Sequence, residues 1–232
     1  MHQYVIPSAL KDRVVRRQGK LFSHDTIDAA QTALVVVDMQ NYFVAEGFPL
    51  EVPMAREIVP NINRLARELR GAGGTVVWLQ TTSAGALETW ANHHKFMLTP
   101  DVAKTRVSNL DEKAPGFALY SQLEALPSDI RVKKVKYSAF IQGSSDIDAQ
   151  LKSRGIERLL IAGTVTNVCC ESTARDAMML DYRVIMLADG NAAITDEEHA
   201  ASLNSFLGCF GDVMTTNEAI ARLVPATMRR SA

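Results

Sequence analysis

The chain has 232 residues, of which 47% are hydrophobic and 22% charged, and its 25 Lys and Arg side chains nearly balance 26 Asp and Glu side chains. This is ordinary globular composition, and the absence of a basic excess argues against nucleic acid or an anionic membrane as a partner. Three cysteines give no disulfide framework, and no apolar run approaches the roughly 20 residues of a membrane span. The first residues contain no long apolar region typical of a signal peptide. We therefore expect a soluble, cytoplasmic protein.

Strand and helix patterns alternate along most of the chain. Residues 1–30 are mixed and charged, and we expect an N-terminal extension that packs on the domain surface or on a partner subunit; residues 31–232 form the predicted domain. Short apolar, β-branched runs predict buried strands, and amphipathic runs predict helices between them. The predicted strands are 32–37, 75–81, 130–137, 158–163, 182–189 and 212–216, and the predicted helices lie within 56–74, 117–126, 146–156, 169–180, 196–211 and 217–224.

This alternation predicts βαβ units, and hence an α/β fold with a parallel sheet and helices on both faces. Such folds bind ligands beyond the carboxyl ends of their strands. Asp38 follows the first buried strand, Lys134 lies toward the end of the third, and Cys169 follows the fourth. Three chemically distinct groups are therefore expected at one edge of one sheet.

Cys169 and Cys170 stand where an apolar run changes to a helical pattern. At a helix start, unpaired N–H groups and the macrodipole favour a thiolate, which is the attacking form of cysteine. The alternative is that both thiols are small core residues, because free cysteine is among the most buried residue types. Cys170 points about 100° away around the helix and is expected to pack inward. Cys209 is expected in the core or at an interface.

Asp38 and Lys134 have less specific sequence signals. A carboxylate directly after an apolar strand is costly to bury without a partner, so Asp38 is a candidate general base beside the thiol. Lys134 lies in the run "KKVK", in which any lysine could face solvent. A lysine turned inward could pair with Asp38 and help to hold a thiolate. The turn "GTVTNVC" could aim successive N–H groups at one point and so bind an oxyanion.

The segments "ALVVVDMQNYF", "KVKYSAF" and "GTVTNVCCESTARDA", in this order, resemble the isochorismatase-like cysteine hydrolase superfamily over about residues 30–225. These three motifs are most similar to the motifs of the ureidoacrylate amidohydrolase and N-carbamoylsarcosine amidase-type members of the superfamily. The resemblance implies a three-layer α/β/α sandwich with a parallel, about six-stranded, Rossmann-like sheet. It also implies a homo-oligomer, dimer or tetramer, that needs no cofactor.

By the same resemblance, Asp38, Lys134 and Cys169 form the catalytic triad of the family. Its lysine motif matches Lys134 rather than the neighbouring lysines, and its cysteine motif matches Cys169. The backbone N–H groups of Val165 and Cys169 are expected to form the oxyanion hole, with the Thr164–Val165 peptide cis.

Four further side chains are expected to bind substrate. Gln40 and Phe43 come just after Asp38, and Tyr137 follows Lys134 by three residues. Trp90 lies in the irregular segment 82–100, where such enzymes differ. For each aromatic residue, ordinary core packing is an equally good interpretation.

Two departures from family patterns narrow the expected function. Nicotinamidases carry a metal site after the second strand, but "LQTTSAGALETWANHH" has no Asp-x-His, and the adjacent His93 and His94 cannot both point into one site from a regular helix. We expect no metal. Vinyl-ether-cleaving isochorismatases need only the acid, whereas this chain keeps the cysteine.

The expected function is a cysteine-dependent amidohydrolase of a small linear amide, ureido or carbamoyl compound, which acts through a thioester. The alternative within the family is a hydrolase of a vinyl ether or another small activated substrate. A non-catalytic scaffold is disfavoured because all three triad positions are intact. A dinucleotide-binding protein is disfavoured because "VVVDMQNYF" has no glycine-rich phosphate turn.

Overall fold

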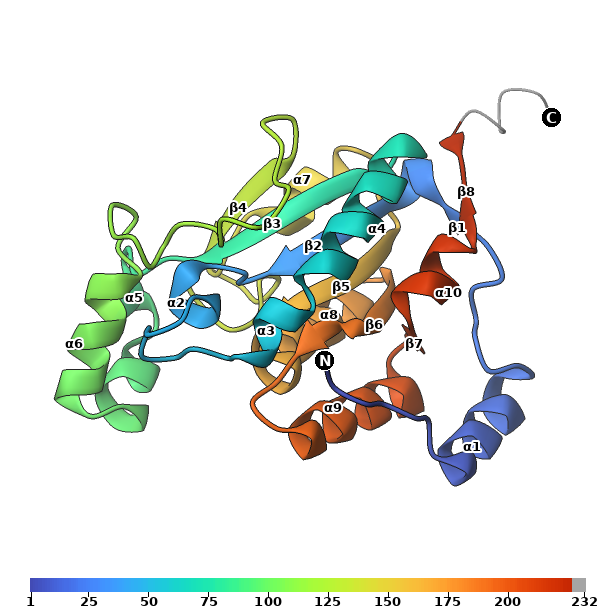
Figure 1. The fold of residues 1–232 in the computed structure, drawn as a ribbon, viewed down its shortest axis with the longest axis horizontal. Coiled ribbons are helices and arrows are strands. Elements are labelled where there is room, and N and C mark those ends of the chain that lie inside the picture. Colours follow the sequence, from blue (N-terminus) through green and yellow to red (C-terminus); the bar gives the residue numbers. More distant parts are fainter. Residues whose placement is uncertain (227–232) are drawn as a thin grey trace.

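The computed structural model describes residues 1–226, and they form a six-stranded parallel sheet covered by helices on both faces (Figure 1). The strand order is β4-β3-β2-β5-β6-β7, with a separate parallel pair of β1 and β8. The predicted α/β/α architecture is confirmed. The strands are β1 Ile27–Asp28, β2 Thr32–Val37, β3 Thr75–Thr81, β4 Ile130–Lys134, β5 Arg158–Thr164, β6 Arg183–Ala192, β7 Asp212–Met214 and β8 Leu223–Val224.

The central strands are apolar on both sides because both of their faces are covered. All six residues of β2 are buried, with Ala33, Val35 and Val37 packing toward one helix layer and Leu34 and Val36 toward the other. This is the pattern of a fully covered parallel sheet rather than of a strand with one wet face.

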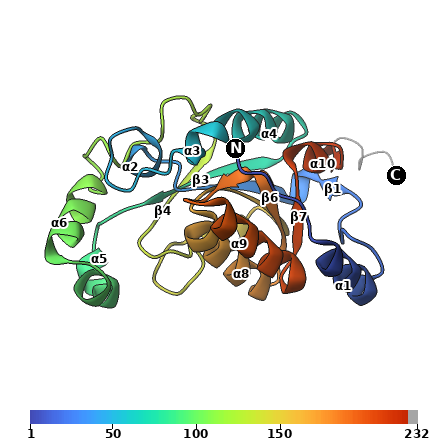
Figure 2. The same cartoon turned by 60° about the horizontal axis from the view of Figure 1, so that its bottom comes forward.

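Two helix layers cover the sheet (Figure 2). One layer contains α1 Ser8–Gln18, α7 Ile147–Lys152, α8 Glu171–Met179 and α9 Asp196–Cys209. The other contains α2 Asn41–Val44, α3 Met54–Glu57, α4 Val59–Gly71 and α10 Thr216–Ile220. The short helix α5 Ala86–Thr89, a π-helical turn at His93–Met97 and α6 Pro100–Asn109 extend beyond the sheet at the left of Figure 1. A 3-10 turn, Ala29–Gln31, precedes β2, and a π-helical turn, Thr166–Cys170, precedes α8.

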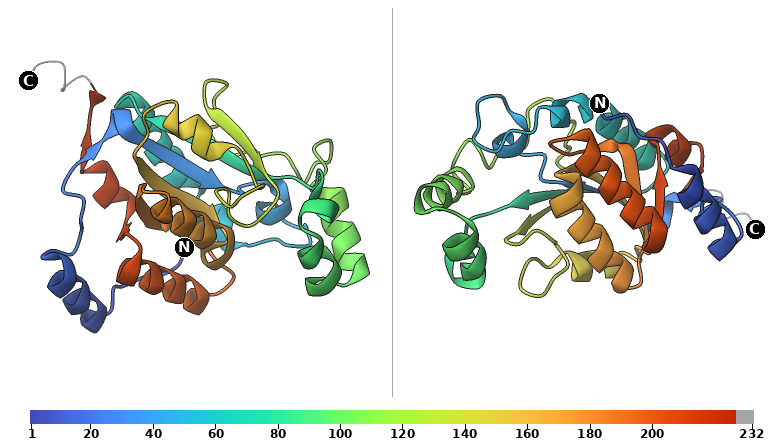
Figure 3. Two further views of the ribbon diagram at one scale, coloured as in Figure 1. Left: turned by 180° about the vertical axis from the view of Figure 1, so that it is seen from behind. Right: turned by 90° about the horizontal axis from the view of Figure 1, so that it is seen from below.

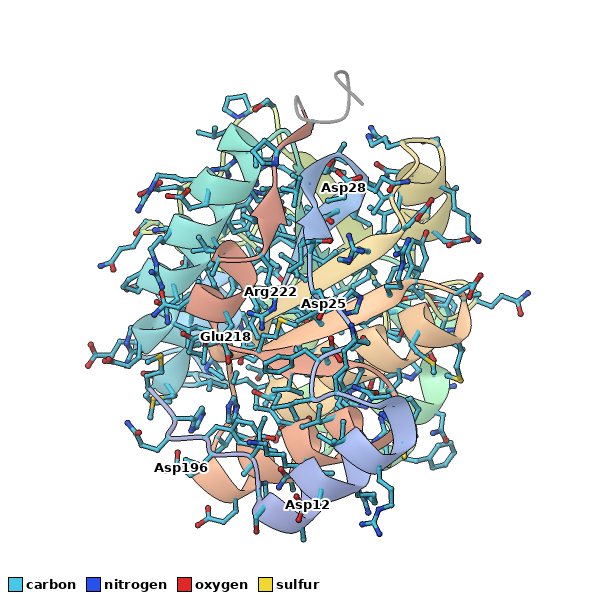
Figure 4. All side chains as sticks on the ribbon, turned by 90° about the vertical axis from the view of Figure 1, so that its right-hand side faces the viewer. Asp12, Asp25, Asp28, Asp196, Glu218 and Arg222 are labelled. Atoms are coloured by element: carbon cyan, nitrogen blue, oxygen red, sulfur yellow. The ribbon has the colours of Figure 1, made fainter. Side chains whose placement is uncertain are left out.

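The N-terminal segment packs on this chain's own surface. Helix α1 lies beside α9 (Figure 3), and the Tyr4 hydroxyl donates a hydrogen bond to Asn204 on α9. His2 contacts Asp196 at 2.5 Å, and Figure 4 labels this aspartate on the side where the N-terminal segment crosses α9. The division of the chain at residue 30, and any contact with a partner subunit, stay predictions.

The predicted helix at residues 117–126 is wrong. The backbone there forms turns instead, because it pairs with the end of β2: Asn41 N–H donates to the Ala118 carbonyl, and Tyr120 N–H donates to the Met39 carbonyl. Its apolar side chains pack on the core from these turns. Tertiary pairing has overridden a weak helical pattern. The other predicted elements exist, with two corrections to their ends. The strand predicted over 130–137 ends at Lys134. The helix predicted within 217–224 ends at Ile220, and Leu223–Val224 form strand β8 instead.

Within residues 1–226, none of the helices has the length and apolar character that crossing a membrane requires. The cytoplasmic location stays a prediction.

Gly163 fixes how closely β5 approaches β2 at the edge where the candidate residues lie. It pairs in register with Val37, has φ of +121°, and a Cβ at this position would lie 2.1 Å from the Val37 carbonyl oxygen. Only glycine fits both the backbone conformation and the space.

We therefore expect Gly163→Ala to lower the free energy of unfolding by about 3 kcal/mol or more, because the clash is with backbone that cannot move aside. Denaturant unfolding followed by circular dichroism measures this. Gly71→Ala is the control: nothing lies within 4 Å of its added methyl group, and in a helix alanine should change stability by at most about 1 kcal/mol, in the favourable direction. An unchanged midpoint for Gly163→Ala would contradict the account.

Candidate active site

Three groups from three strands meet at one edge of the sheet. Asp38 directly follows β2, Lys134 is the last residue of β4, and Cys169 lies in the π-helical turn after β5. Strand β3 runs between β2 and β4, and its last residue is Thr81. Because all four strands are parallel, their carboxyl ends bring these side chains to the same edge.

A buried ion pair joins Asp38 and Lys134. The Lys134 Nζ lies 2.8 Å from Asp38 Oδ2, and the exposed fractions of the two side chains are 0% and 1%. The Thr81 hydroxyl bridges them: it donates to Asp38 Oδ1 at 2.9 Å and accepts from Lys134 Nζ at 2.8 Å. Lys134 also donates to the Lys136 carbonyl. Although burial works against the charge, Asp38 and then Cys169 raise the pKa of Lys134 above its usual value, so the lysine stays charged.

The neighbouring lysines have other partners. Lys133 is exposed and pairs with Glu112, and the Lys136 ammonium donates to the Gln142 carbonyl. Alternation along β4 therefore turns only Lys134 of this run inward to Asp38. The local pattern "KKVK" left this choice open, whereas the family resemblance pointed to Lys134.

Cys169 rests as a protonated thiol. It is 6% exposed, and burial raises its pKa to about 12; Lys134 opposes this rise, while the charge of Asp38 and a hydrogen bond to Asp38 add to it. The expectation that the helix start would favour the thiolate is wrong for this resting state, because desolvation dominates. The thiol therefore needs a base to take its proton, and Asp38 is the group beside it.

The other two cysteines are in different surroundings. Cys170 is buried in the core layer that includes α8, as expected, and burial raises its pKa well above the usual value. Cys209 is exposed on α9, so a core position is wrong, and the alternative of an interface position stays a prediction.

The turn before Cys169 has the predicted cis peptide between Thr164 and Val165. The N–H groups of Val168 and Cys170 both donate to the Val165 carbonyl, which winds the chain tightly around this residue. The Thr166 hydroxyl, 2.9 Å from His199 Nδ1, ties the turn to α9. An oxyanion hole made by the N–H groups of Val165 and Cys169 stays a prediction.

Gln40 and Phe43, two of the residues predicted to contact substrate, are buried in the protein interior. The Gln40 amide donates to the carbonyls of Thr81 and Phe117 and accepts from Thr81 N–H, so it fastens β2 to β3. Phe43 is buried among core side chains beside Tyr42. Neither presents an open surface, so their predicted contact with substrate has less support than that of Trp90 and Tyr137.

Trp90 and Tyr137 belong to an aromatic cluster next to Cys169. Their ring centroids lie 4.7 Å apart, and Trp90 stacks on His93 at 4.1 Å. Both residues are half-buried. Burial raises the pKa of Tyr137, and Cys169 adds to this rise, which places the phenol within electrostatic range of the thiol. His94 packs edge-on against His93, and the π-helical backbone buries both histidine rings.

Comparison with known proteins identifies the family. Residues 32–218 match the isochorismatase domain. The chain belongs to the isochorismatase-like cysteine hydrolases. Ureidoacrylate amidohydrolase RutB of Variovorax paradoxus (strain S110) is 33% identical over 219 residues, which cover 87% of this chain and 84% of that protein.

Solved structures agree with the fold of this isochorismatase-like hydrolase. A cysteine hydrolase from Pseudomonas syringae pv. phaseolicola 1448A has a TM-score of 0.76 at 31% identity, covering 85% of this chain and 94% of that one. N-carbamoylsarcosine amidase from Thermoplasma acidophilum shares the fold, with a TM-score of 0.62 at 23% identity over 81% of this chain and 97% of that one.

Two site residues of this isochorismatase-like hydrolase escaped the sequence analysis. Thr81 could have been found from its place at the end of the second strand, because that edge was already expected to hold the site. Arg106, on α6, is 7% exposed and acts electrostatically on Cys169, Lys134 and Tyr137. No sequence signal marks it, because a lone arginine in an irregular region is ordinarily at the surface.

The residues described here contain no cluster of three or more His, Cys, Asp or Glu side chains arranged to hold a metal ion. The adjacent His93 and His94 are packed with Trp90 instead.

The buried ion pair predicts that replacing Lys134 destabilises the fold much more than replacing the neighbouring Lys133. Lys134→Met leaves the Asp38 carboxylate buried and unpaired, and should lower the free energy of unfolding by about 3–5 kcal/mol. Lys133→Met removes only an exposed pair and should change it by less than about 1 kcal/mol. Denaturant unfolding measures both. The double variant Asp38→Asn, Lys134→Met should recover part of the loss; equal effects of the two single variants would refute the assignment.

The raised pKa of Cys169 predicts how the rate of its alkylation depends on pH. Because a thiol stays protonated below its pKa, alkylation of Cys169 by iodoacetamide should rise about tenfold per pH unit from about pH 7 to about pH 9.5, without a plateau. Peptide mass spectrometry locates the label, and the exposed Cys209 reports the activity of the reagent. A rate that levels off below about pH 8 would mean a thiolate near neutral pH, contrary to this description.

Proposed function

We propose that this protein is a cysteine-dependent amidohydrolase that cleaves a C–N bond of a small linear amide, ureido or carbamoyl compound. The observation that carries the proposal is the convergence of the Asp38–Lys134 pair on a buried thiol, Cys169, at the ligand-binding edge of the sheet. The relative named ureidoacrylate amidohydrolase, and the shared fold of N-carbamoylsarcosine amidase, support C–N hydrolysis.

Asp38 is the proposed general base. Its Oδ2 forms the ion pair with Lys134, and the Cys169 thiol is hydrogen-bonded to the same carboxylate, so the base is in place to take the thiol proton. As Asp38 takes this proton, the sulfur of Cys169 attacks the substrate carbonyl carbon. Lys134 stays charged, and its attraction lowers the cost of forming a thiolate in a buried site.

The tetrahedral intermediate carries a negative oxygen, which we assign to the N–H groups of Val165 and Cys169. Asp38 then gives its proton to the leaving nitrogen, the C–N bond breaks, and ammonia or an amine departs. A water molecule gives a proton to Asp38 as it attacks the thioester, and the C–S bond breaks to release the acid. The proton returns to the sulfur, so the resting thiol is regenerated.

The proposal is tested by a screen for ammonia release over small amides, ureides and carbamoyl acids. We expect one compound class to be hydrolysed, and Cys169→Ala to reduce its turnover by at least about 10³-fold. Cys170→Ala is the matched control and should retain activity within about tenfold, because the neighbouring thiol only packs in the core. Mass spectrometry of the product identifies the bond that is cleaved.

Inactivity toward every compound would contradict the amidohydrolase proposal, and so would turnover that survives in Cys169→Ala. Surviving turnover of an enol ether would instead favour the vinyl ether hydrolase, which needs the acid but no nucleophile.

A further inference from the structure

Arg106 carries a buried positive charge that the proposed mechanism does not use. Its side chain is 7% exposed, and none of the ion pairs within residues 1–226 includes it. The guanidinium donates a hydrogen bond to the hydroxyl of Tyr42, which is itself buried. A neutral hydroxyl does not balance a charge that has been taken out of water. The site therefore contains a cation with no anionic partner in the described part of the chain.

The charge of Arg106 acts on the proposed catalytic group rather than on a remote surface. Helix α6 packs against the π-helical turn His93–Met97, and its end is fastened to the chain after β3 by the hydrogen bond from Ser83 N–H to the Leu110 carbonyl. Burial raises the pKa of Cys169 and of Tyr137, and Arg106 opposes both rises. Since α6 packs on the turn that carries His93, and the His93 ring stacks on Trp90, the buried side chain of Arg106 lies at the aromatic cluster next to the thiol.

A count of charges leaves the site one negative charge short. Lys134 and Asp38 cancel, and Cys169 is neutral near pH 7 because its pKa is raised to about 12. His93 is neutral as well, since burial and then the charge of Arg106 lower its pKa to about 4. Glu112 is balanced by its ion pair with Lys133, and its other oxygen accepts a hydrogen bond from the Thr82 hydroxyl. The charge of Arg106 remains, and a bound anion would balance it.

The surroundings of this charge suit a small organic anion. The rings of Trp90, His93 and Tyr137 lie within 5.4 Å of one another by their centroids, and so form an apolar, aromatic wall. A carboxylate matches the two parallel donors of a guanidinium. The carbon chain of the acid would then lie along the aromatic rings, with the carbonyl that is cleaved at Cys169.

We propose that Arg106 binds the carboxylate of the substrate, so that the substrates are small ureido or amido acids rather than neutral amides. This inference rests on the proposed function and specifies its substrate class. It makes Arg106 a binding residue that selects the substrate, while Asp38 and Cys169 carry out the reaction.

The test compares acids with their uncharged esters. Ammonia release is measured for a series of short ureido and amido acids, such as 3-ureidopropionate, and for the methyl ester of each. For the wild-type protein we expect kcat/KM to be roughly 100-fold higher for the acid than for its ester. In Arg106→Gln, kcat/KM for the acid should fall roughly 100-fold, mainly through KM, while the ester changes by less than about threefold.

Two further variants isolate the role of the guanidinium. Arg106→Lys keeps the charge without the fork of donors and should restore part of the preference for the acid; it also serves if Arg106→Gln does not fold. Lys104→Gln removes an exposed charge from the same helix and should leave the ratio between acid and ester unchanged. A loss of preference in Lys104→Gln as large as that in Arg106→Gln would overturn the proposal.

Binding to Cys169→Ala separates this inference from the proposed function, because binding needs no turnover. Calorimetry should show at least one acid of the series binding Cys169→Ala at least about 30-fold more tightly than its ester, and this difference should vanish when Arg106→Gln is added. Equal binding, or no binding of any acid, overturns the role of Arg106. If acid and ester are turned over equally and turnover still depends on Cys169, the role of Arg106 is overturned but the amidohydrolase proposal stands. If the acid binds tightly through Arg106 but no ammonia is released, the binding site stands and the amidohydrolase proposal is refuted.

Discussion

The ion pair between Lys134 and Asp38 is the interaction on which the rest of the site depends. It joins the ends of β4 and β2 across β3, and Thr81 completes it from the strand between them. Two opposite charges that have lost almost all contact with water are tolerable only when they remain paired and hydrogen-bonded. The pair therefore fixes where the carboxylate sits, and the thiol of Cys169 is placed relative to this fixed point.

The close approach of β5 to β2 brings the turn with Cys169 to the Asp38–Lys134 pair. Gly163 lets the two backbones meet beside Asp38, and the tight turn that follows brings Cys169 to the carboxylate. Burial keeps this thiol protonated at rest, so its reactivity depends on its neighbours rather than on the start of the helix. An enzyme of this design would expose little free thiolate to oxidants between turnovers, because the thiolate forms only when the base and the carbonyl are both in place.

The sheet could be predicted well from the sequence because buried parallel strands consist of continuous runs of apolar, β-branched residues, as in Thr32–Val37. Periodicity also placed Asp38 and Cys169 at strand ends, but the choice of Lys134 within "KKVK", and the cis peptide before Val165, came from the family resemblance. The helix predicted over 117–126 failed because pairing with the end of β2 is a long-range contact that local pattern does not contain. Arg106 was missed for a related reason: the burial of a charge depends on what folds over it.

The most direct test of the central claim is to look for the acyl group on Cys169. The protein is mixed with a compound that it hydrolyses, and samples are quenched in acid at times from milliseconds to the steady state. Each sample is then digested with trypsin, which places both adjacent cysteines in the peptide 159–175. We expect a mass increase equal to the acyl part of the substrate, located by fragmentation on Cys169. An adduct on Cys170 or on another residue, or turnover without an adduct at any time point, would contradict the account.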